Sequence, residues 1–223
     1  MAGKICSQQH GFVRGRSVVS NLLIYSDLIS DALDSSLQVD VLYTDFAKAF
    51  DSVSHRCLIN KLLDLGLDGH FVTWVYSYLE GHSQRVRLQG FISEPIEVTS
   101  GVPQGSHLGP ILFLLFVNDL VSGLKFVKGL LYADDFKAYE IVRSINDAIL
   151  FQADLDYLSQ WSYANGLDFN LSKCKILSFS KGRSPICFDY SLYCTQLERV
   201  DIISGIWVSY SVLILVFLVM WIW

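Results

Sequence analysis

Residues 129–139 read GLLYADDFKAY, in which two adjacent aspartates, Asp134 and Asp135, follow an apolar run and precede Phe136. Neighbouring carboxylates repel each other, and placing them beside a buried strand is costly unless a positive charge lies close by. The wider stretch 126–142 has the pattern of a strand, a tight turn and a second strand, with the aspartates at the bend. We therefore expect a hairpin that carries this charge at its turn, and a cationic partner for it.

The segments that flank this hairpin predict a mixture of helices and strands. Apolar residues at helical spacing predict helices over 18–34, with Ser17 as the N-terminal cap, and over 56–66, 70–80 and 145–165. The Gly- and Pro-rich loop 100–110 leads into a further apolar helix through about residue 121. Strands are expected at 39–46, 84–89, 95–99 and 174–180. Because the order does not alternate strictly as strand, helix, strand, the pattern favours an α+β fold over a doubly wound sheet.

The composition fits one sizeable hydrophobic core. The chain has 223 residues, of which 52% are hydrophobic and 17% charged, with a net charge of −5 and a pI of about 5.4. This balance gives no overall basic signature of nucleic-acid binding, although a local groove can still be basic. The five cysteines form no CxxC pair and no zinc-type cluster, and their odd number favours a reducing compartment.

A third aspartate is expected near the two aspartates of the hairpin. Asp45 ends the expected strand 39–46, and if that strand lies beside the hairpin, three carboxylates converge at one edge of a sheet. Such a cluster stays ionised when divalent cations neutralise it, and hard oxygen ligands select Mg²⁺ or Mn²⁺. Two such ions about 3.5–4 Å apart are the arrangement used for phosphoryl transfer. The alternative is an ordinary turn, where Asp-Asp is common because Asp suits turn geometry.

Five blocks of sequence, in order, weigh against that alternative. They are 9-QHGFVRGRSVVSNLL-23, 40-DVLYTDFAKAFDSVSH-55, 98-VTSGVPQGSHLGPILFLLFVNDL-120, 131-LYADD-135 and 170-NLSKCKILSF-179. Over residues 8 to about 203 the chain resembles the reverse transcriptases of non-LTR retrotransposons, most closely the jockey-like group. The resemblance implies a polymerase palm, an antiparallel sheet packed on helices, with partial fingers and no complete thumb. It also implies a fragment of an RNA-directed DNA polymerase that adds nucleotides to a primer 3′-hydroxyl.

The resemblance assigns metal-binding roles to four positions. It implies that Asp45 is the first metal ligand, that Asp134 binds both of two Mg²⁺ (or Mn²⁺) ions, and that Asp135 is the less essential member of its pair. It also implies that the backbone carbonyl of Phe46 faces the second ion.

Further positions are assigned to the nucleotide in the same way. Phe50 falls where the family places a steric gate against the ribose 2′-hydroxyl, and Gln104 and Gly105 fall in the loop that packs against the nascent base pair. Lys173 would protonate or neutralise the departing pyrophosphate. A core aromatic remains the ordinary alternative for Phe50, and a solvated surface lysine the alternative for Lys173.

The implied partners are an RNA template, a DNA primer and deoxynucleoside triphosphates. Arg14 and Arg16 are candidates for contacting triphosphate or template phosphate. One departure from the family pattern follows the aspartates, where Phe136 replaces the Thr that we expect before Lys137. The competing hypothesis is a catalytically inactive remnant of a retrotransposon that binds nucleic acid or is anchored in a membrane by its tail.

The C-terminal tail has a different character from the rest of the chain. We divide the sequence into a partial fingers segment at 1–39, a palm at 40–204 and a hydrophobic tail at 205–223. Residues 206–223 carry no charge and reach the lower length limit for a transmembrane helix. We favour out-of-frame translation from Gly205 onward, because one of the shifted frames permits the Asp-Leu-Gly-Val of relatives, and a genuine membrane anchor is the alternative. Ancestry predicts a nuclear or cytoplasmic location, and a genuine tail predicts membrane association.

Overall fold

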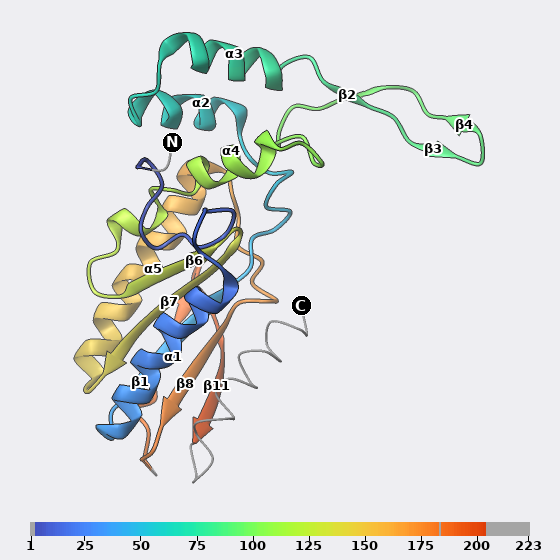
Figure 1. The fold of residues 1–223 in the computed structure, drawn as a ribbon. Coiled ribbons are helices and arrows are strands. Elements are labelled where there is room, and N and C mark those ends of the chain that lie inside the picture. Colours follow the sequence, from blue (N-terminus) through green and yellow to red (C-terminus); the bar gives the residue numbers. More distant parts are fainter. Residues whose placement is uncertain (1–2, 183, 204–223) are drawn as a thin grey trace.

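The computed structural model describes residues 3–182 and 184–203, and its centre is a five-stranded sheet (Figure 1). The spatial order of the strands is β11-β8-β1-β7-β6. Their bounds are β1 Gln38–Thr44, β6 Lys128–Tyr132, β7 Asp135–Val142, β8 Lys175–Ser180 and β11 Glu198–Ile203. Neighbouring strands are antiparallel except for β8 and β11, which run parallel at one edge. The expected hairpin and the strands near 39–46 and 174–180 are confirmed.

Helix α1 (Val18–Asp34) covers one face of the sheet (Figure 1). Ser17 caps it as predicted, because its hydroxyl accepts a hydrogen bond from the Ser20 N–H at 3.2 Å while the Ser20 hydroxyl accepts from the Ser17 N–H at 2.9 Å. The buried side of α1, which includes Tyr25 and Ile29, packs on the inward residues of β1, β6, β7 and β8. This layer joins the N-terminal segment to the sheet in one core.

Helix α5 (Ile145–Asn165) lies behind the opposite face (Figure 1) and also matches its predicted bounds. Its buried residues share a second core with the inward faces of the sheet and of the remaining helices. Within it, the buried carboxylate of Asp154 accepts hydrogen bonds from the backbone N–H groups of Phe126 at 2.7 Å and Val127 at 2.8 Å. This carboxylate fixes the segment that leads into β6.

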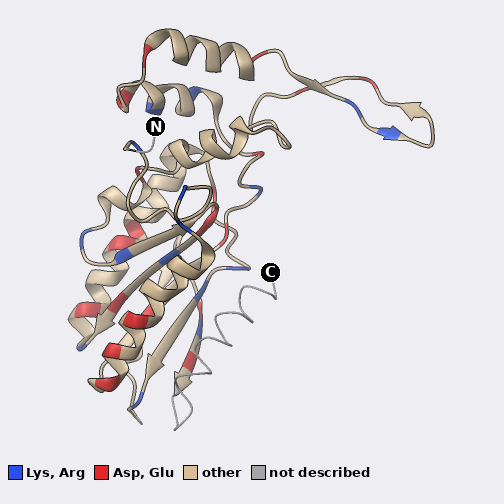
Figure 2. Ribbon diagram, viewed as in Figure 1, with Lys and Arg blue, Asp and Glu red and all other residues tan. Residues whose placement is uncertain are grey.

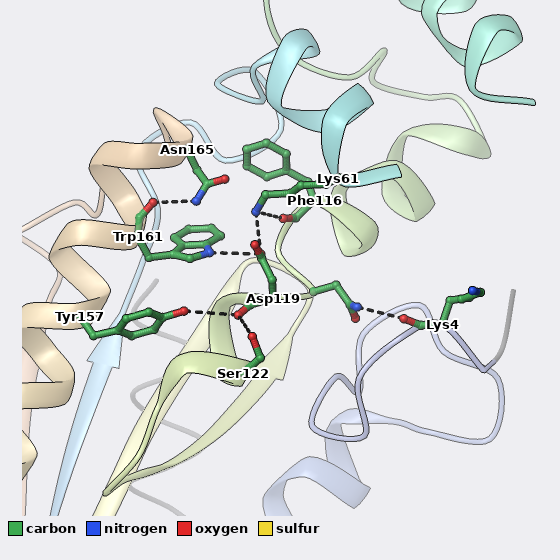
Figure 3. A network of polar contacts seen from close by, with 9 residues as sticks. Lys4, Lys61, Phe116, Asp119, Ser122, Tyr157, Trp161 and Asn165 are labelled. Carbon is green, nitrogen blue, oxygen red and sulfur yellow. Dashed lines mark hydrogen bonds and ion pairs between the residues drawn. The ribbon is translucent and has the colours of Figure 1, made fainter. Parts of the chain in front are cut away.

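Three further helices stack at one end of the sheet: α2 (His55–Asp64), α3 (Gly69–Leu79) and α4 (Leu108–Phe116) (Figure 1). A polar network ties α2 and α4 to α5 (Figure 3). The Lys61 ammonium donates to Asp119 Oδ1 at 2.6 Å and to the Phe116 carbonyl at 2.7 Å, and Trp161 Nε1 donates to the same Asp119 oxygen at 3.1 Å. The helix expected to run through about residue 121 ends at Phe116, and a short 3₁₀ turn, η1 (Leu120–Gly123), follows.

Residues 81–99 form an arm that projects away from the sheet (Figure 1). It contains two short antiparallel pairs, β2 (Ser83–Gln84) with β5 (Ile96–Glu97) and β3 (Arg87–Leu88) with β4 (Phe91–Ile92). The continuous strand predicted at 84–89 is interrupted, because the Val86 N–H donates to the Ser93 hydroxyl at 2.9 Å instead of a ladder carbonyl. Several apolar side chains of the arm are exposed, among them Phe91 at 81%.

The last described segment contains a small hairpin that the pattern did not predict, β9 (Ser191–Leu192) and β10 (Thr195–Gln196). The predicted hydrophobic segment 206–223 lies outside the described residues. Among the described helices, none is both long enough and apolar enough to cross a lipid bilayer.

Candidate functional site

The three predicted aspartates lie at one end of the sheet. Asp45 follows directly after β1, whose last residue, Thr44, pairs with Phe136 of β7. In the hairpin the pair Tyr132–Asp135 closes a two-residue turn, which places Asp134 in the turn. Because β1 and β7 are neighbours, Asp45 comes next to the residues of this turn, as the sequence predicted for adjacent strands.

Crowding of negative charge perturbs the aspartates of the turn. Desolvation by the surrounding protein raises the pKa of Asp134, and the charge of Asp45 adds to this effect. Desolvation and then the charge of Asp134 raise the pKa of Asp135 to about 6, although Asp135 is exposed at the surface. Two carboxyl groups with raised pKa values indicate a place where added positive charge is favoured.

Lysines supply part of that charge. The ammonium of Lys173 lies 3.2 Å from Asp45 Oδ2. The backbone supports this contact, because the Asn170 N–H donates to the Asp45 carbonyl at 2.7 Å and the Lys173 N–H donates to the Asn170 carbonyl at 2.9 Å. Lys173, which the resemblance placed at the leaving pyrophosphate, is therefore beside the first predicted metal ligand.

A second cation, Lys137, was not assigned a role from the sequence. It is buried on β7, and its ammonium lies 5.6 Å from the ring centre of Tyr25 and 5.5 Å from that of Tyr43. Burial lowers the pKa of Lys137, and the charge of Asp135 opposes this shift. A signal was present, because a lysine two residues after Asp135 falls on the same face of a buried strand.

The donors at this end of the sheet suit a hard divalent cation in type but do not form one three-carboxylate cluster. No three Asp, Glu, His or Cys side chains of the described residues come close enough together to hold an ion. Asp134 and Asp135 are consecutive, one in the turn and one in the strand, so their side chains do not share one direction. The carboxylates of Asp45 and Asp134 are oxygen donors of the type that hard divalent cations prefer.

The backbone carbonyl of Phe46 was predicted to face the second ion. The side chain of Phe46 is buried and stacks on Phe169 with ring centres 4.6 Å apart, so the ring belongs to the core. The flanking groups, the Asp45 carbonyl and the Ala47 N–H, bond to Asn170 and Asp168 on the β8 side. Backbone groups alternate along a strand, so the Phe46 carbonyl points to the opposite side, where the β6–β7 turn lies.

Of the residues predicted to contact the nucleotide, Phe50, Gln104 and Gly105 lie in two segments that hydrogen-bond to each other, 50–51 and 102–105. The rings of Phe50 and Phe113 lie 4.6 Å apart, and the Val102 N–H donates to the Phe50 carbonyl at 2.8 Å. The Gln104 amide donates to Asp51 Oδ1 at 2.8 Å, on the rim of a cavity of about 480 Å³ next to the arm. Gly105 follows with a φ of +80°, which favours glycine.

The two predicted arginines lie in the N-terminal loop. Arg14 is exposed, whereas the Arg16 guanidinium donates to the carbonyls of Cys6 and Gln9 and so holds the loop together. Acidic residues lie along α1 and α5, and Lys and Arg are distributed over loops, strands and helix α2 (Figure 2).

Comparison with known proteins identifies the family whose sequences this chain resembles. The family described as reverse transcriptase (RNA-dependent DNA polymerase) matches residues 1–203. A probable RNA-directed DNA polymerase from the transposon X-element of Drosophila melanogaster is 33% identical over 183 residues, covering 79% of this chain and 20% of the relative. The RNA-directed DNA polymerase from the mobile element jockey of Drosophila funebris is 30% identical over 158 residues, covering 67% of this chain and 17% of the relative. The chain thus spans a fifth or less of the length of these two relatives.

Solved structures resemble the fold at low sequence identity. An apo telomerase from Candida tropicalis matches with a TM-score of 0.58 at 14% identity, covering 79% of this chain and 37% of that one. A Candida albicans telomerase in complex with a fragment of telomeric RNA matches with a TM-score of 0.57 at 15% identity, covering 76% of this chain and 32% of that one. The likeness confirms an α+β fold consistent with a partial polymerase palm.

Proposed function

This chain belongs to the reverse transcriptase (RNA-dependent DNA polymerase) family, and we propose that it acts as the catalytic palm of an RNA-directed DNA polymerase. The observation that carries the proposal is the meeting of Asp45 with the Asp134–Asp135 turn on neighbouring strands, with Lys173 beside Asp45. These are the residues that the family pattern assigns to nucleotidyl transfer, and they come together from three distant segments.

In the proposed mechanism the carboxylates of Asp45 and Asp134 and the carbonyl of Phe46 would hold two divalent cations, Mg²⁺ or Mn²⁺. When bound, these ions would activate the primer 3′-hydroxyl and stabilise the charge that develops on the triphosphate. The raised pKa of Asp134 supports a site that gains from added positive charge. Asp135 contributes negative charge to the same end of the sheet.

Lys173 acts on the leaving group in this proposal. Its ammonium, which pairs with Asp45 in this structure, would donate a proton or a hydrogen bond to a phosphate oxygen of the departing pyrophosphate. The side chains of Lys173 and Asp45 are 38% and 27% exposed, so the contact is accessible from solvent.

The nucleotide would be bounded by Phe50, whose flat ring excludes a ribose 2′-hydroxyl and so selects deoxynucleoside triphosphates. The Phe50–Phe113 contact supports this role because it holds the ring in place. Gln104 and Gly105 would lie against the nascent base pair, where glycine permits a close approach of the backbone. Arg14, exposed in the N-terminal loop, is the better placed of the two arginines to contact a phosphate, because Arg16 is engaged with carbonyls of its own loop.

The proposed partners are an RNA template and a DNA primer. The assignment of residues 1–39 to the fingers and 40–204 to the palm rests on the order of the sequence blocks, and we propose a nuclear or cytoplasmic location on ancestry.

Primer extension tests the proposed activity. We expect the purified protein to extend oligo(dT) on poly(rA) with Mg²⁺ or Mn²⁺, and we expect Asp134→Ala to abolish extension, because it removes a carboxylate that holds the cations. Asp156→Ala, a change of an exposed aspartate on α5, is the matched control and should retain activity. Equal extension by the wild type and Asp134→Ala would refute the catalytic proposal and leave the inactive remnant as the better description.

A further inference from the structure

The turn that carries Asp134 has a backbone that its own sequence does not favour. Ala133, the first residue of the turn, has a φ of +55°, whereas Asp134 does not share a positive φ. This is the pattern of a type II′ hairpin turn, which prefers glycine at its first position. An alanine in the left-handed region costs about 1 kcal/mol or more. Surrounding contacts must therefore hold the turn in this conformation.

Gln9 makes those contacts. Its Oε1 accepts hydrogen bonds from the N–H groups of Ala133 at 3.0 Å and of Gly11 at 2.7 Å, and its Nε2 donates to the Ala133 carbonyl at 3.4 Å. Because two N–H groups converge on one atom of the side chain, that atom must be the oxygen, which fixes the orientation of the amide. Both backbone polar groups of Ala133 are thus bound by one side chain.

The backbone on either side of Gln9 follows the neighbouring strand. The His10 N–H donates to the Leu131 carbonyl at 2.9 Å, and the Leu131 N–H donates to the Gln8 carbonyl at 3.0 Å, which forms a short parallel bridge to β6. Gly11 completes the contact: a Cβ there would lie 2.2 Å from the Ala133 nitrogen. The segment 8–11 therefore fits the turn closely enough to exclude even a methyl group.

The Gln9 side chain is not available to a substrate. The residue is only 1% exposed, and both ends of its amide are already hydrogen-bonded to the protein. A contact with template, primer or nucleotide would require these bonds to break and would leave buried polar groups without partners. Its effect on any chemistry at this end of the sheet must pass through the turn.

We propose that Gln9 is a positioning residue that holds the Ala133–Asp134 turn and thereby sets the place of the Asp134 carboxylate relative to Asp45. The inference rests on the proposed function, because it concerns the same pair of carboxylates. It extends that function by linking an N-terminal loop, through one buried amide, to the affinity of the site for divalent cations.

The test replaces the amide with a side chain of similar length and no hydrogen bonds, Gln9→Met. The matched control is Gln8→Met, which changes the exposed neighbour. Binding of Mn²⁺ alone is measured from the loss of the free-ion signal in electron paramagnetic resonance, with melting temperatures recorded for each protein. We expect Gln9→Met to weaken Mn²⁺ binding by about ten-fold, the size expected from the loss of buried hydrogen bonds. Gln8→Met should bind as the wild type does.

Steady-state kinetics separate positioning from general destabilisation. In primer extension at saturating Mn²⁺, Gln9→Met should lower kcat while the KM for the nucleotide stays near that of the wild type, because the residue touches no substrate. Mn²⁺ binding and kcat equal to those of the wild type would overturn the inference. So would losses in proportion to the fraction of unfolded protein, because Gln9 would then act only on stability.

Hydrogen exchange of the wild type judges the contact without any variant or activity. We expect the Ala133 amide to exchange as slowly as the amides of β6 and β7, because it donates to a buried oxygen. Exchange as fast as that of an open turn would overturn the inference even in an active protein. Slow exchange in a protein that extends no primer would instead count against the proposed function alone, so the two failures can be told apart.

Discussion

The ammonium of Lys173 lies 3.2 Å from a carboxylate oxygen of Asp45, the carboxylate that the proposed function assigns to a metal ion. A lysine and a divalent cation that share one carboxylate compete for it. The ion pair with Lys173 neutralises the negative charge of Asp45, and a bound cation would weaken that ion pair. This competition separates the two effects of Lys173, on metal affinity and on the leaving group.

Lys173→Met should therefore raise Mn²⁺ affinity while it lowers the rate of extension. A partly exposed ion pair is worth about 0.5–1 kcal/mol, so we expect a gain in affinity of about two- to five-fold. The loss of a proton donor should lower kcat by about 100-fold. Lys175→Met, which removes a surface pair with Glu198, is the control and should change neither quantity. Weaker Mn²⁺ binding in Lys173→Met would show that the lysine supports the site instead of competing for it.

The raised pKa of Asp135 predicts a specific dependence of stability on pH. The folded protein holds the proton of Asp135 up to about pH 6, whereas the unfolded chain releases it near the ordinary value of 3.8. The folded state therefore binds more protons between these values, and the contribution of this group to stability falls as pH rises through that range. In Asp135→Asn this component is absent.

Urea unfolding across the range from about pH 4 to about pH 7 measures the effect. We expect the free energy of unfolding of Asp135→Asn, relative to the wild type, to increase as pH rises and to level off above about pH 6. A difference that stays constant with pH would contradict the shifted pKa.

Phe50→Ala should relax the discrimination against ribonucleotides. The substitution removes the ring that is proposed to exclude the 2′-hydroxyl, and incorporation of ribonucleotides relative to deoxynucleotides should rise by about ten-fold or more. Because the ring is only partly buried against Phe113, we expect the stability to fall by about 1–2 kcal/mol. Phe188→Ala, which removes a ring 5.0 Å from Tyr190, is the control for lost packing. Unchanged selectivity in Phe50→Ala would leave that ring as an ordinary core aromatic.

Lys61→Met tests the polar network that joins α2, α4 and α5 (Figure 3). Burial lowers the pKa of Lys61, and the hydrogen bond to Asp119 opposes the shift. Removal of the ammonium leaves the Phe116 carbonyl without this donor and leaves Asp119, which also accepts from Trp161, without its ion pair. We expect the free energy of unfolding to fall by about 1–3 kcal/mol. Lys181→Met, which breaks a surface pair with Asp34, should cost under about 0.5 kcal/mol. Equal losses in the two variants by urea unfolding would mean that burial adds nothing to the network.

Local signals predicted much of this architecture. Helices α1 and α5 follow from periodic apolar residues, with Ser17 as the predicted cap of α1, and the central hairpin follows from apolar strands on either side of a charged turn. The β9–β10 hairpin was missed because its turn places Tyr193 and Cys194 at positive φ, where neither residue type signals a turn. Strand β11 was missed because its charged residues, including Glu198 and Arg199, lie on a sheet edge and break the apolar alternation.

The candidate site divides in the same way. The sequence motifs located the aspartates and Lys173, because those residues are specified by type and order. The roles of Gln9 and Lys137 depend on contacts between distant segments, namely a buried amide on the Ala133 backbone and an ammonium beside the ring of Tyr25. No local pattern encodes such contacts, so they emerge only when the chain is folded.

The projecting arm has a consequence for how the protein behaves in a test tube. It presents an exposed apolar surface on short strands with unpaired edges, made of Val86, Leu88, Phe91, Ile92 and Ile96. At high protein concentration the molecules should self-associate through this surface. Dynamic light scattering should then show a particle size that increases with added ammonium sulfate. Replacing Leu88 and Phe91 with lysine should keep the preparation monodisperse, because the added charge interrupts the exposed apolar surface.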